Sequence, residues 1–385
     1  MATRLCLPHG WQELSGSVRL DGAALSDPYP ATYLPDQPAS PCIAVNLETH
    51  GVKSTTHLRF EVPPLVLPSQ TAEITPLAEV VNLAASRREI GLQVSSLRPQ
   101  HAELGLDMPA GWLSTRTGAG FAVQPPEDVA VGMYHLLLTI DGSLAQTVRV
   151  IAQDHVDSRA LVRPATTDVL VIDAALPDVR VGYMGGGNDR VDHWLGRMGA
   201  DVTPLTDADM QSDQRLDAVD TIVIGIFALK SRPALIREMP RIHSWIAAGG
   251  TLLTLYHRPW DNWDPEVVPP AMLQIGQPSL RWRVTDETAA VTHLADHPVL
   301  TSPNKITAED WSGWLKERGL YFAKAWANAY TPLVEMADPG EAAHRGALLT
   351  AEIGKGRHTH CALILHHQME KLVPGAFRLM ANLIA

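Results

Sequence analysis

The chain has 385 residues, of which 45% are hydrophobic and 19% charged, enough to build two or three domains that each bury a core. Its formal net charge of -11 argues against a broad nucleic-acid surface, because phosphate binding requires clustered Lys and Arg. No apolar run is long enough to cross a bilayer. The composition therefore predicts a soluble globular protein that binds neither nucleic acid nor membrane.

The N-terminal segment MATRLCLPHGWQEL lacks the continuous apolar stretch and the small-residue cleavage site of a signal peptide. We therefore expect a cytoplasmic protein, or a secreted one if a leader has been removed. Cys6, Cys42 and Cys361 are too few and too scattered for a disulfide framework or a Cys-based zinc site. We expect them to be small buried hydrophobic residues.

Residues before about 160 form short alternating runs separated by proline and glycine, a pattern typical of half-buried antiparallel strands. The runs include HLRFEV, EIGLQVSSL, YHLLLTI and QTVRVIA. We predict β-sandwich modules at residues 1–75 and 76–160, with the proline-rich SDPYPATYLPDQPASP as an ordered surface loop or linker. Trp112 and Phe121 are expected core residues of the second module, with sugar stacking as the alternative.

After residue 160 the pattern changes to alternating strands and helices. The expected strands are VRVGYM, DVTPL, DTIVIGI and TLLTLYH, and the expected helices are RVDHWLGRMG and ALIREMPRIHSWIAAGG. The first helix places Val191, Trp194, Leu195 and Met198 on one stripe. Apolar strands joined by helices indicate a parallel sheet covered on both faces. Residues 161–385 are therefore predicted to form a flavodoxin-like α/β domain.

A glycine run, residues 185–187, separates the first strand of this domain from its helix, and Asn188 and Asp189 follow it. The spacing does not fit the Gly-x-Gly-x-x-Gly pattern of a dinucleotide site, and no phosphate-binding Gly-Lys-Ser/Thr is present. Nucleotide binding stays open as one reading. The pattern favours a tight strand-to-helix turn in which Asn188 or Asp189 caps the helix.

Ligands of open parallel sheets bind beyond the carboxyl ends of the strands, which here predicts a crevice formed by residues 185–189, 227–230, 256–261 and 366–368. His257 and His366 are the candidate catalytic residues and the candidate zinc ligands, with no cofactor as the main expectation. In the alternative, one histidine lies at the crevice and the others bond locally. The candidate ligand-binding residues are Gly186, Asn188, Asp189, Tyr256, Trp260, Asp261, His367, Gln368 and Arg318.

Two further clusters have two interpretations each. His358 and His360 share one face of an expected strand, where they can chelate a metal or simply pack beside neighbours. A second set mixes charge and indole within fifteen positions, which fits a polyhydroxylated ligand or a loop fixed by an Arg318 ion pair and Trp packing. This set is Asn304, Lys305, Asp310, Trp311, Trp314, Glu317 and Arg318.

Class I glutamine amidotransferases have a comparable layered domain, and their chemistry needs a cysteine on the sharp turn after a central strand. In GGTLLTLYHRPW that turn holds Tyr256, His257 and Arg258, without Cys or Ser. Amidotransfer by that mechanism is therefore not expected.

The segments RVTDETAAVTHLADHPVLTSPNKITAEDWSGWLKERGLYFAKAW, EIGKGRHTHCALIL and VPGAFRLMANLI resemble the C-terminal region of large PIG-L-type (LmbE-like) deacetylases. VGYMGGGNDRVDHWLGRMG and DMPAGW resemble the same family, so the resemblance covers roughly residues 76 to 385. It implies β-sandwich modules followed by a glutamine-amidotransferase-like domain. Where the family pattern reads Gln-Tyr-Asn and Phe-Phe-Arg-Gln, this chain has LYHR and HHQM.

The zinc motif of those deacetylases, His-Pro-Asp-Asp-Glu, is absent, because His297-Pro298 is followed by Val299 and Leu300. The resemblance therefore implies a non-deacetylase pseudoenzyme, an accessory or binding protein linked to carbohydrate or N-acyl-sugar processing. Its expected partners are a sugar-like ligand, a separately encoded deacetylase or other carbohydrate-processing enzyme, and a second copy of itself. The alternatives are a hydrolase that uses His257 and His366 with nearby carboxylates, and a structural assembly protein.

Overall fold

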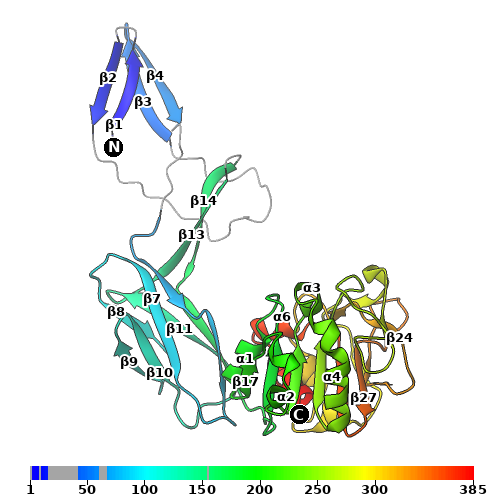
Figure 1. Ribbon diagram of the computed structural model, residues 1–385. Helices are drawn as coiled ribbons and strands as arrows, with labels where there is room; N and C mark the ends of the chain where they lie inside the picture. Colours follow the sequence, from blue (N-terminus) through cyan, green and yellow to red (C-terminus); the bar gives the residue numbers. More distant parts are fainter. Residues whose placement is uncertain (1, 8–9, 16–41, 60–66, 154–155) are drawn as a thin grey trace.

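The computed structural model describes residues 2–7, 10–15, 42–59, 67–153 and 156–385 (Figure 1). It is a mixed α/β protein that contains several sheets and far more strand than helix. Within the described residues, no helix combines the length and apolar character needed to cross a bilayer.

Two antiparallel hairpins precede the larger sheets. β1 (Ala2–Leu7) pairs with β2 (Gly10–Ser15), and β3 (Cys42–Thr49) pairs with β4 (Val52–Arg59). The proline-rich segment expected as a loop or linker lies outside the described residues.

The next region contains two sheets. The six-stranded sheet has the order β14-β13-β5-β7-β10-β9, and the five-stranded sheet has the order β12-β11-β15-β6 with β8 paired to β11. The strands are β5 (Thr71–Thr75), β6 (Ala78–Asn82), β7 (Ile90–Arg98), β8 (Leu104–Asp107), β9 (Leu113–Thr117), β10 (Gly120–Gln124), β11 (Gly132–Ile140), β12 (Ser143–Leu144), β13 (Gln146–Gln153), β14 (Val156–Pro164) and β15 (Thr166–Ile172).

One hydrophobic core joins the two sheets. Leu92 and Val123 come from the first sheet and Leu136 and Val169 from the second, and all four are fully buried. This arrangement follows from the alternation in each strand, which turns every second side chain toward the other sheet. Trp112 and Phe121 belong to the same core at 6% and 5% exposure, so their expected core position is confirmed.

The module boundaries expected from the sequence both fall inside these sheets. β5 pairs with β7, so the six-stranded sheet begins before residue 76. β15 pairs with β11 and β6, so the five-stranded sheet extends to residue 172, beyond the expected boundary at 160.

The C-terminal region is built on a seven-stranded sheet with the order β17-β16-β18-β19-β28-β27-β25. The first five of these strands are parallel to one another, while β27 and β25 are antiparallel additions. The strands are β16 (Arg180–Met184), β17 (Asp201–Pro204), β18 (Thr221–Ile224), β19 (Thr251–Leu255), β25 (Thr331–Pro332), β27 (Leu348–Ile353) and β28 (Gly356–Cys361). This order is consistent with the expected flavodoxin-like domain.

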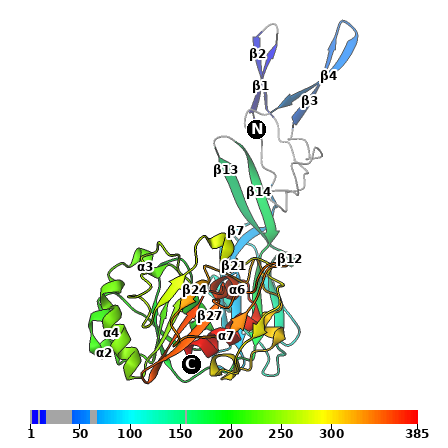
Figure 2. The ribbon, with the colours of Figure 1, turned by 90° about the vertical axis from the view of Figure 1, so that its right-hand side faces the viewer.

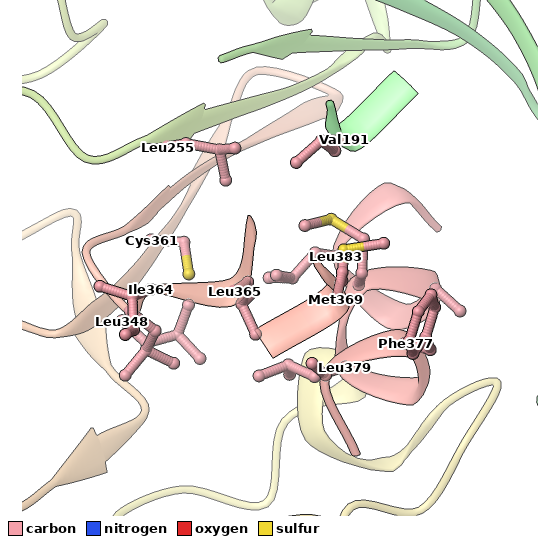
Figure 3. Close-up of a cluster of buried hydrophobic side chains, with 14 of the residues drawn as sticks. Val191, Leu255, Leu348, Cys361, Ile364, Leu365, Met369, Phe377, Leu379 and Leu383 are labelled. Atoms are coloured by element: carbon pink, nitrogen blue, oxygen red, sulfur yellow. The ribbon is translucent and has the colours of Figure 1, made fainter. Parts of the chain in front are cut away.

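Each face of this sheet has its own core. α1 (Val191–Met198), α6 (Leu365–Glu370) and α7 (Pro374–Ile384) cover one face, and α4 (Leu235–Ala248) covers the other. Figure 2 shows α4 on the opposite side of the sheet from α6 and α7. Figure 3 shows part of the first core, where Cys361 lies near Leu348, Ile364 and Leu365, and Phe377 of α7 lies on the other side of the view. The four residues predicted on one stripe of α1 are the four that it buries, so that prediction is confirmed.

Long excursions connect β19 to β27. They contain the short helix α5 (Pro298–Thr301) and three two-stranded pairs, β20–β24, β21–β23 and β22–β26. The strands are β20 (Leu273–Ile275), β21 (Arg283–Val284), β22 (Thr292–His293), β23 (Gly319–Leu320), β24 (Ala323–Trp326) and β26 (Val334–Glu335). The C-terminal region also contains two single helical turns, α2 (Asp213–Leu216) and α3 (Ala228–Ser231). Its 3₁₀ turns are at Asp209–Gln211, Ser279–Arg281 and Ala308–Trp311.

The two-sheet region packs against α1 through polar side chains. Asn82 at the end of β6 donates to the carbonyls of Ala174 at 2.9 Å and Met198 at 3.1 Å. Arg197 Nε lies 2.5 Å from Glu79 Oε1, with side chains only 13% and 4% exposed. The two regions therefore share a buried, hydrogen-bonded interface.

Candidate functional site

The carboxyl ends of β16, β18, β19 and β28 meet at one edge of the parallel sheet. The segments that follow these strands are the four that the sequence predicted to form a site. What each side chain bonds to decides which of them is free to meet a ligand.

The glycine turn after β16 is tied to its own surroundings. Tyr183 OH donates to Asp189 Oδ1 at 2.5 Å, and the backbone N–H groups of Val191 and Ile226 donate to the same carboxylate at 3.0 and 2.9 Å. Burial raises the pKa of Asp189, which these donors oppose. Asp189 therefore binds the first N–H of α1 and joins the β16 turn to the β18 turn.

Gly186 and Asn188 serve the same turn. The Gly186 carbonyl accepts from Asn188 Nδ2 at 3.1 Å and from Ser231 Oγ at 3.3 Å. A Cβ on Gly186 would lie 2.8 Å from Ala228 Cα, so the glycine permits close contact with α3. Packing therefore accounts for Gly186, while Gly187 has a φ of 78° that favours glycine.

His257 is fully buried and both of its ring nitrogens are engaged. Nδ1 donates to the Leu255 carbonyl at 2.8 Å, and Nε2 accepts from the Leu229 N–H at 3.3 Å. Burial lowers the pKa of His257 to about 4, so the ring is neutral near pH 7. Neither nitrogen is left for a proton transfer or a metal bond, and the structure gives His257 a structural place.

Asp261 is also fully buried, and its partner is Arg258. Arg258 Nη2 donates to Asp261 Oδ1 at 2.7 Å, and the Arg258 backbone N–H donates to Oδ2 at 2.9 Å. The guanidinium lies 4.2 Å from the Phe227 ring centre and 5.7 Å from that of Trp260. Asp261 thus positions Arg258 over two aromatic rings.

Arg318 and Gln368 bond to backbone groups of the long excursion between β19 and β27. The Arg318 guanidinium donates to the backbone carbonyls of Ala289 and Trp311, and burial lowers its pKa to about 10. No carboxylate of the described residues pairs with it, so the expected Arg318 ion pair is replaced by carbonyl contacts. Gln368 Oε1 accepts from the Leu315 N–H at 2.9 Å, while Nε2 donates to the Leu315 carbonyl at 2.8 Å.

His358 and His360 face the interior. Thr254 Oγ1 lies 3.0 Å from His358 Nε2 and 2.9 Å from His360 Nδ1, and Tyr330 OH lies 2.6 Å from His358 Nδ1. Both histidines are fully buried. The shared strand face therefore supports a core hydrogen-bond chain.

A cluster of rings remains at the edge, which we call the Tyr256 cluster: Phe227, Tyr256, Trp260, Tyr321 and His366. The Tyr256 ring centre lies 5.2 Å from Phe227, 5.6 Å from His366 and 6.2 Å from Tyr321, and Trp260 lies 5.9 Å from Tyr321. Trp260 is 59% exposed, so the cluster opens to solvent through its indole.

His366 lies on α6 rather than on an extended segment, because the helix begins at Leu365 directly after β28. Its Nδ1 is buried and has no hydrogen-bond partner among the described residues. Burial lowers its pKa to about 4. The neighbouring His367 is half-buried on the same helix and makes no ring contact with the cluster in the described structure.

Three non-glycine residues at this edge have left-handed backbone conformations: Phe227 with φ 54°, Lys316 with φ 78° and Tyr321 with φ 55°. Such conformations cost of order 1 kcal/mol or more and gather at binding sites, where the surrounding structure enforces them. Tyr321 lies in the segment that resembles the PIG-L-type family but is not among the candidate site residues. It is 65 residues from Tyr256 in the chain, and the fold stacks the two rings at 6.2 Å between centres.

Neither a cysteine nucleophile nor a metal cluster is found at this edge within the described residues. Cys361 is fully buried in β28, and burial raises the pKa of its thiol to about 12. No group of three or more His, Cys, Asp or Glu that could hold a metal occurs in the part of the chain that the structure describes. The side chains of Cys6 and Cys42 lie outside that part.

Two hollows of about 240 and 320 Å³ lie elsewhere, one between β5, β7 and β13 and the other along residues 293–306. Neither includes a residue of the Tyr256 cluster.

No family model matches the sequence, and no curated protein matches it. Solved structures similar to it include a candidate GMP synthase component from Thermoplasma acidophilum, at 11% identity and TM-score 0.34, over 54% of this chain and 94% of that one. A candidate ThuA-like protein from Bacteroides uniformis has 11% identity and TM-score 0.35, over 54% and 91%. The exo-β-1,4-mannosidase Op5Man5 from Opitutaceae bacterium strain TAV5 has 14% identity and TM-score 0.33, over 55% of this chain and 36% of that one.

Proposed function

We propose that this protein is a non-catalytic binding protein that holds a sugar-like ligand on the Tyr256 cluster. The observation that carries the proposal is the contrast at one edge of the sheet. His257, Asp261, Arg318 and Gln368 are engaged in internal hydrogen bonds, while Trp260 remains exposed on a packed group of rings. Aromatic faces beside polar groups suit the apolar faces and hydroxyls of sugars.

The proposal includes the accessory role that the family resemblance implies, in which the bound ligand is presented to a separately encoded deacetylase or other carbohydrate-processing enzyme. It also treats the two sheets of residues 67–172 as a β-sandwich module of the kind that accompanies such enzymes. The shared core of the two sheets supports this assignment.

The test is calorimetric titration of the purified chain with maltose, cellobiose and N,N′-diacetylchitobiose. We expect at least one disaccharide to bind, and Trp260→Ala to weaken its binding by about 2 kcal/mol because the stacking face is lost. Leu113→Ala is the control, since Leu113 is 70% exposed on β9 of the two-sheet region.

Two results would contradict the proposal. One is the absence of binding to any of the three disaccharides at millimolar concentration, or binding that Trp260→Ala leaves unchanged. The other is turnover of a bound disaccharide by the wild-type protein that His366→Ala abolishes, which would favour the hydrolase alternative.

A further inference from the structure

We propose that the Tyr256 cluster selects an uncharged ligand with neighbouring hydroxyl groups, and that the carboxylate of Glu317 is the acceptor that recognises them. This inference rests on the proposed function and adds the chemical class of the ligand. It is built from the position of Glu317, from the absence of donors around it among the described residues and from the charges beside it.

The backbone around Glu317 is fixed on both sides. Gln368 binds both the N–H and the carbonyl of Leu315. The Arg318 N–H donates to the Val284 carbonyl at 3.0 Å, and the Ile364 N–H donates to the Arg318 carbonyl at 3.2 Å. The intervening Lys316 has φ 78°, a conformation that this clamping enforces. Glu317 is therefore held in one position before any ligand arrives.

The Glu317 carboxylate is deeply set but receives no hydrogen bond from the described residues. Its side chain is 8% exposed, and the Lys316 Nζ is 3.8 Å from Oε1, too far for a hydrogen bond. Burial raises the pKa of Glu317, and the nearby Lys316 and Arg283 only partly oppose that rise.

The hydroxyl of Tyr256, near Glu317, is also without a hydrogen-bond partner among the described residues. Tyr256 is 5% exposed. Its pKa is raised first by burial and then by the charge of Glu317, so the two groups are electrostatic neighbours. A carboxylate whose contact with Lys316 is 3.8 Å long and a hydroxyl without a partner among the described residues can together bind the donors and acceptors of adjacent hydroxyl groups.

The surrounding charges disfavour ionised ligands of either sign. The charges of Lys316 and Arg283 act on Glu317 and lower its pKa, and Arg258 already covers the rings of Phe227 and Trp260. A cationic ligand would face these three basic groups. An anionic ligand would be repelled by the carboxylate of Glu317 itself.

The test compares three disaccharides with the same β-1,4 skeleton: cellobiose, the anionic cellobiouronic acid and the cationic chitobiose. We expect the wild-type protein to bind cellobiose at least tenfold more tightly than either charged disaccharide. Glu317→Gln should weaken cellobiose binding at least tenfold and reduce the difference in affinity between cellobiose and cellobiouronic acid. Tyr256→Phe should weaken cellobiose binding by several fold. Glu309→Gln is the matched control, because Glu309 is an exposed carboxylate of a neighbouring turn.

The thermal midpoint separates recognition from a structural role. Glu317→Gln should unfold at the wild-type temperature or above, because it removes a buried charge without donors. A lower midpoint overturns the inference. Binding that depends on Trp260 but not on Glu317, or that favours a charged disaccharide, overturns this inference and leaves the proposed function standing. Failure of the wild-type protein to bind any disaccharide overturns both.

Discussion

Asp189, His257 and Asp261 have the chemistry of catalytic residues but bond to nearby groups of the protein. Each follows the carboxyl end of a parallel strand, where the chain turns and its N–H and carbonyl groups lose their sheet partners. A buried polar group without a partner is costly, so a carboxylate or imidazole at such a turn satisfies the neighbouring backbone. Their residue types could be read in the sequence, whereas their partners could not.

Asp189→Asn tests this structural role. The amide would present N–H groups toward the donors Tyr183 OH and Ile226 N–H, so we expect the free energy of unfolding to fall by about 2 kcal/mol. Asp192→Asn is the control, because Asp192 lies in the first turn of α1, where its interaction with the helix dipole is worth about 0.5 kcal/mol. Urea denaturation measures both, and equal losses would refute the assigned role of Asp189.

At the scale of elements, α1 was predictable because its apolar stripe and terminal glycine are local signals. Its packing partner was not, since β6 lies more than a hundred residues earlier in the chain. Gly199 ends α1 with φ 101°, and a Cβ there would lie 2.6 Å from the Cβ of Ala85. The glycine is therefore required both by the helix end and by the contact with the two-sheet region.

Gly199→Ala should lower the free energy of unfolding by roughly 2 kcal/mol, from backbone strain and from the contact with Ala85. Gly249→Ala provides the comparison, because Gly249 ends α4 with φ 135°, and a Cβ added there would meet no atom within 4 Å. Its loss should come from strain alone and be smaller. A Gly249→Ala variant that is destabilised more than Gly199→Ala in urea would show that the Ala85 contact is unimportant.

For the whole molecule, buried neutral histidines link stability to pH. Burial lowers the pKa of His257 and His366 to about 4 and that of His360 to about 3, against an ordinary value of 6.5. Below pH 6.5 the unfolded chain binds protons that the folded chain does not. Stability is therefore complete above pH 6.5 and falls as the pH drops toward 4.

We expect each of these histidines to cost on the order of 1 kcal/mol at pH 5.5, so the urea midpoint should drop clearly between pH 7.5 and 5.5. His257→Asn should remove the contribution of one proton-binding group from the pH dependence of the urea midpoint. His101→Gln, at an exposed site, should leave that dependence unchanged. A midpoint independent of pH across this range would contradict the assignment.

The sequence by itself determined the strands of the parallel sheet, α1 and α4 and the core positions of Trp112 and Phe121. These features depend on apolar periodicity and on glycine at turns, which act over a few residues. Only the tertiary structure decided which polar side chains remain free. His257 bonds to Leu229, Gln368 to Leu315 and Tyr256 stacks near Tyr321, and each partner comes from a distant segment. Hydrogen-bond satisfaction in the folded chain is a property of these long-range contacts, so the sequence pattern could not separate a binding residue from a structural one.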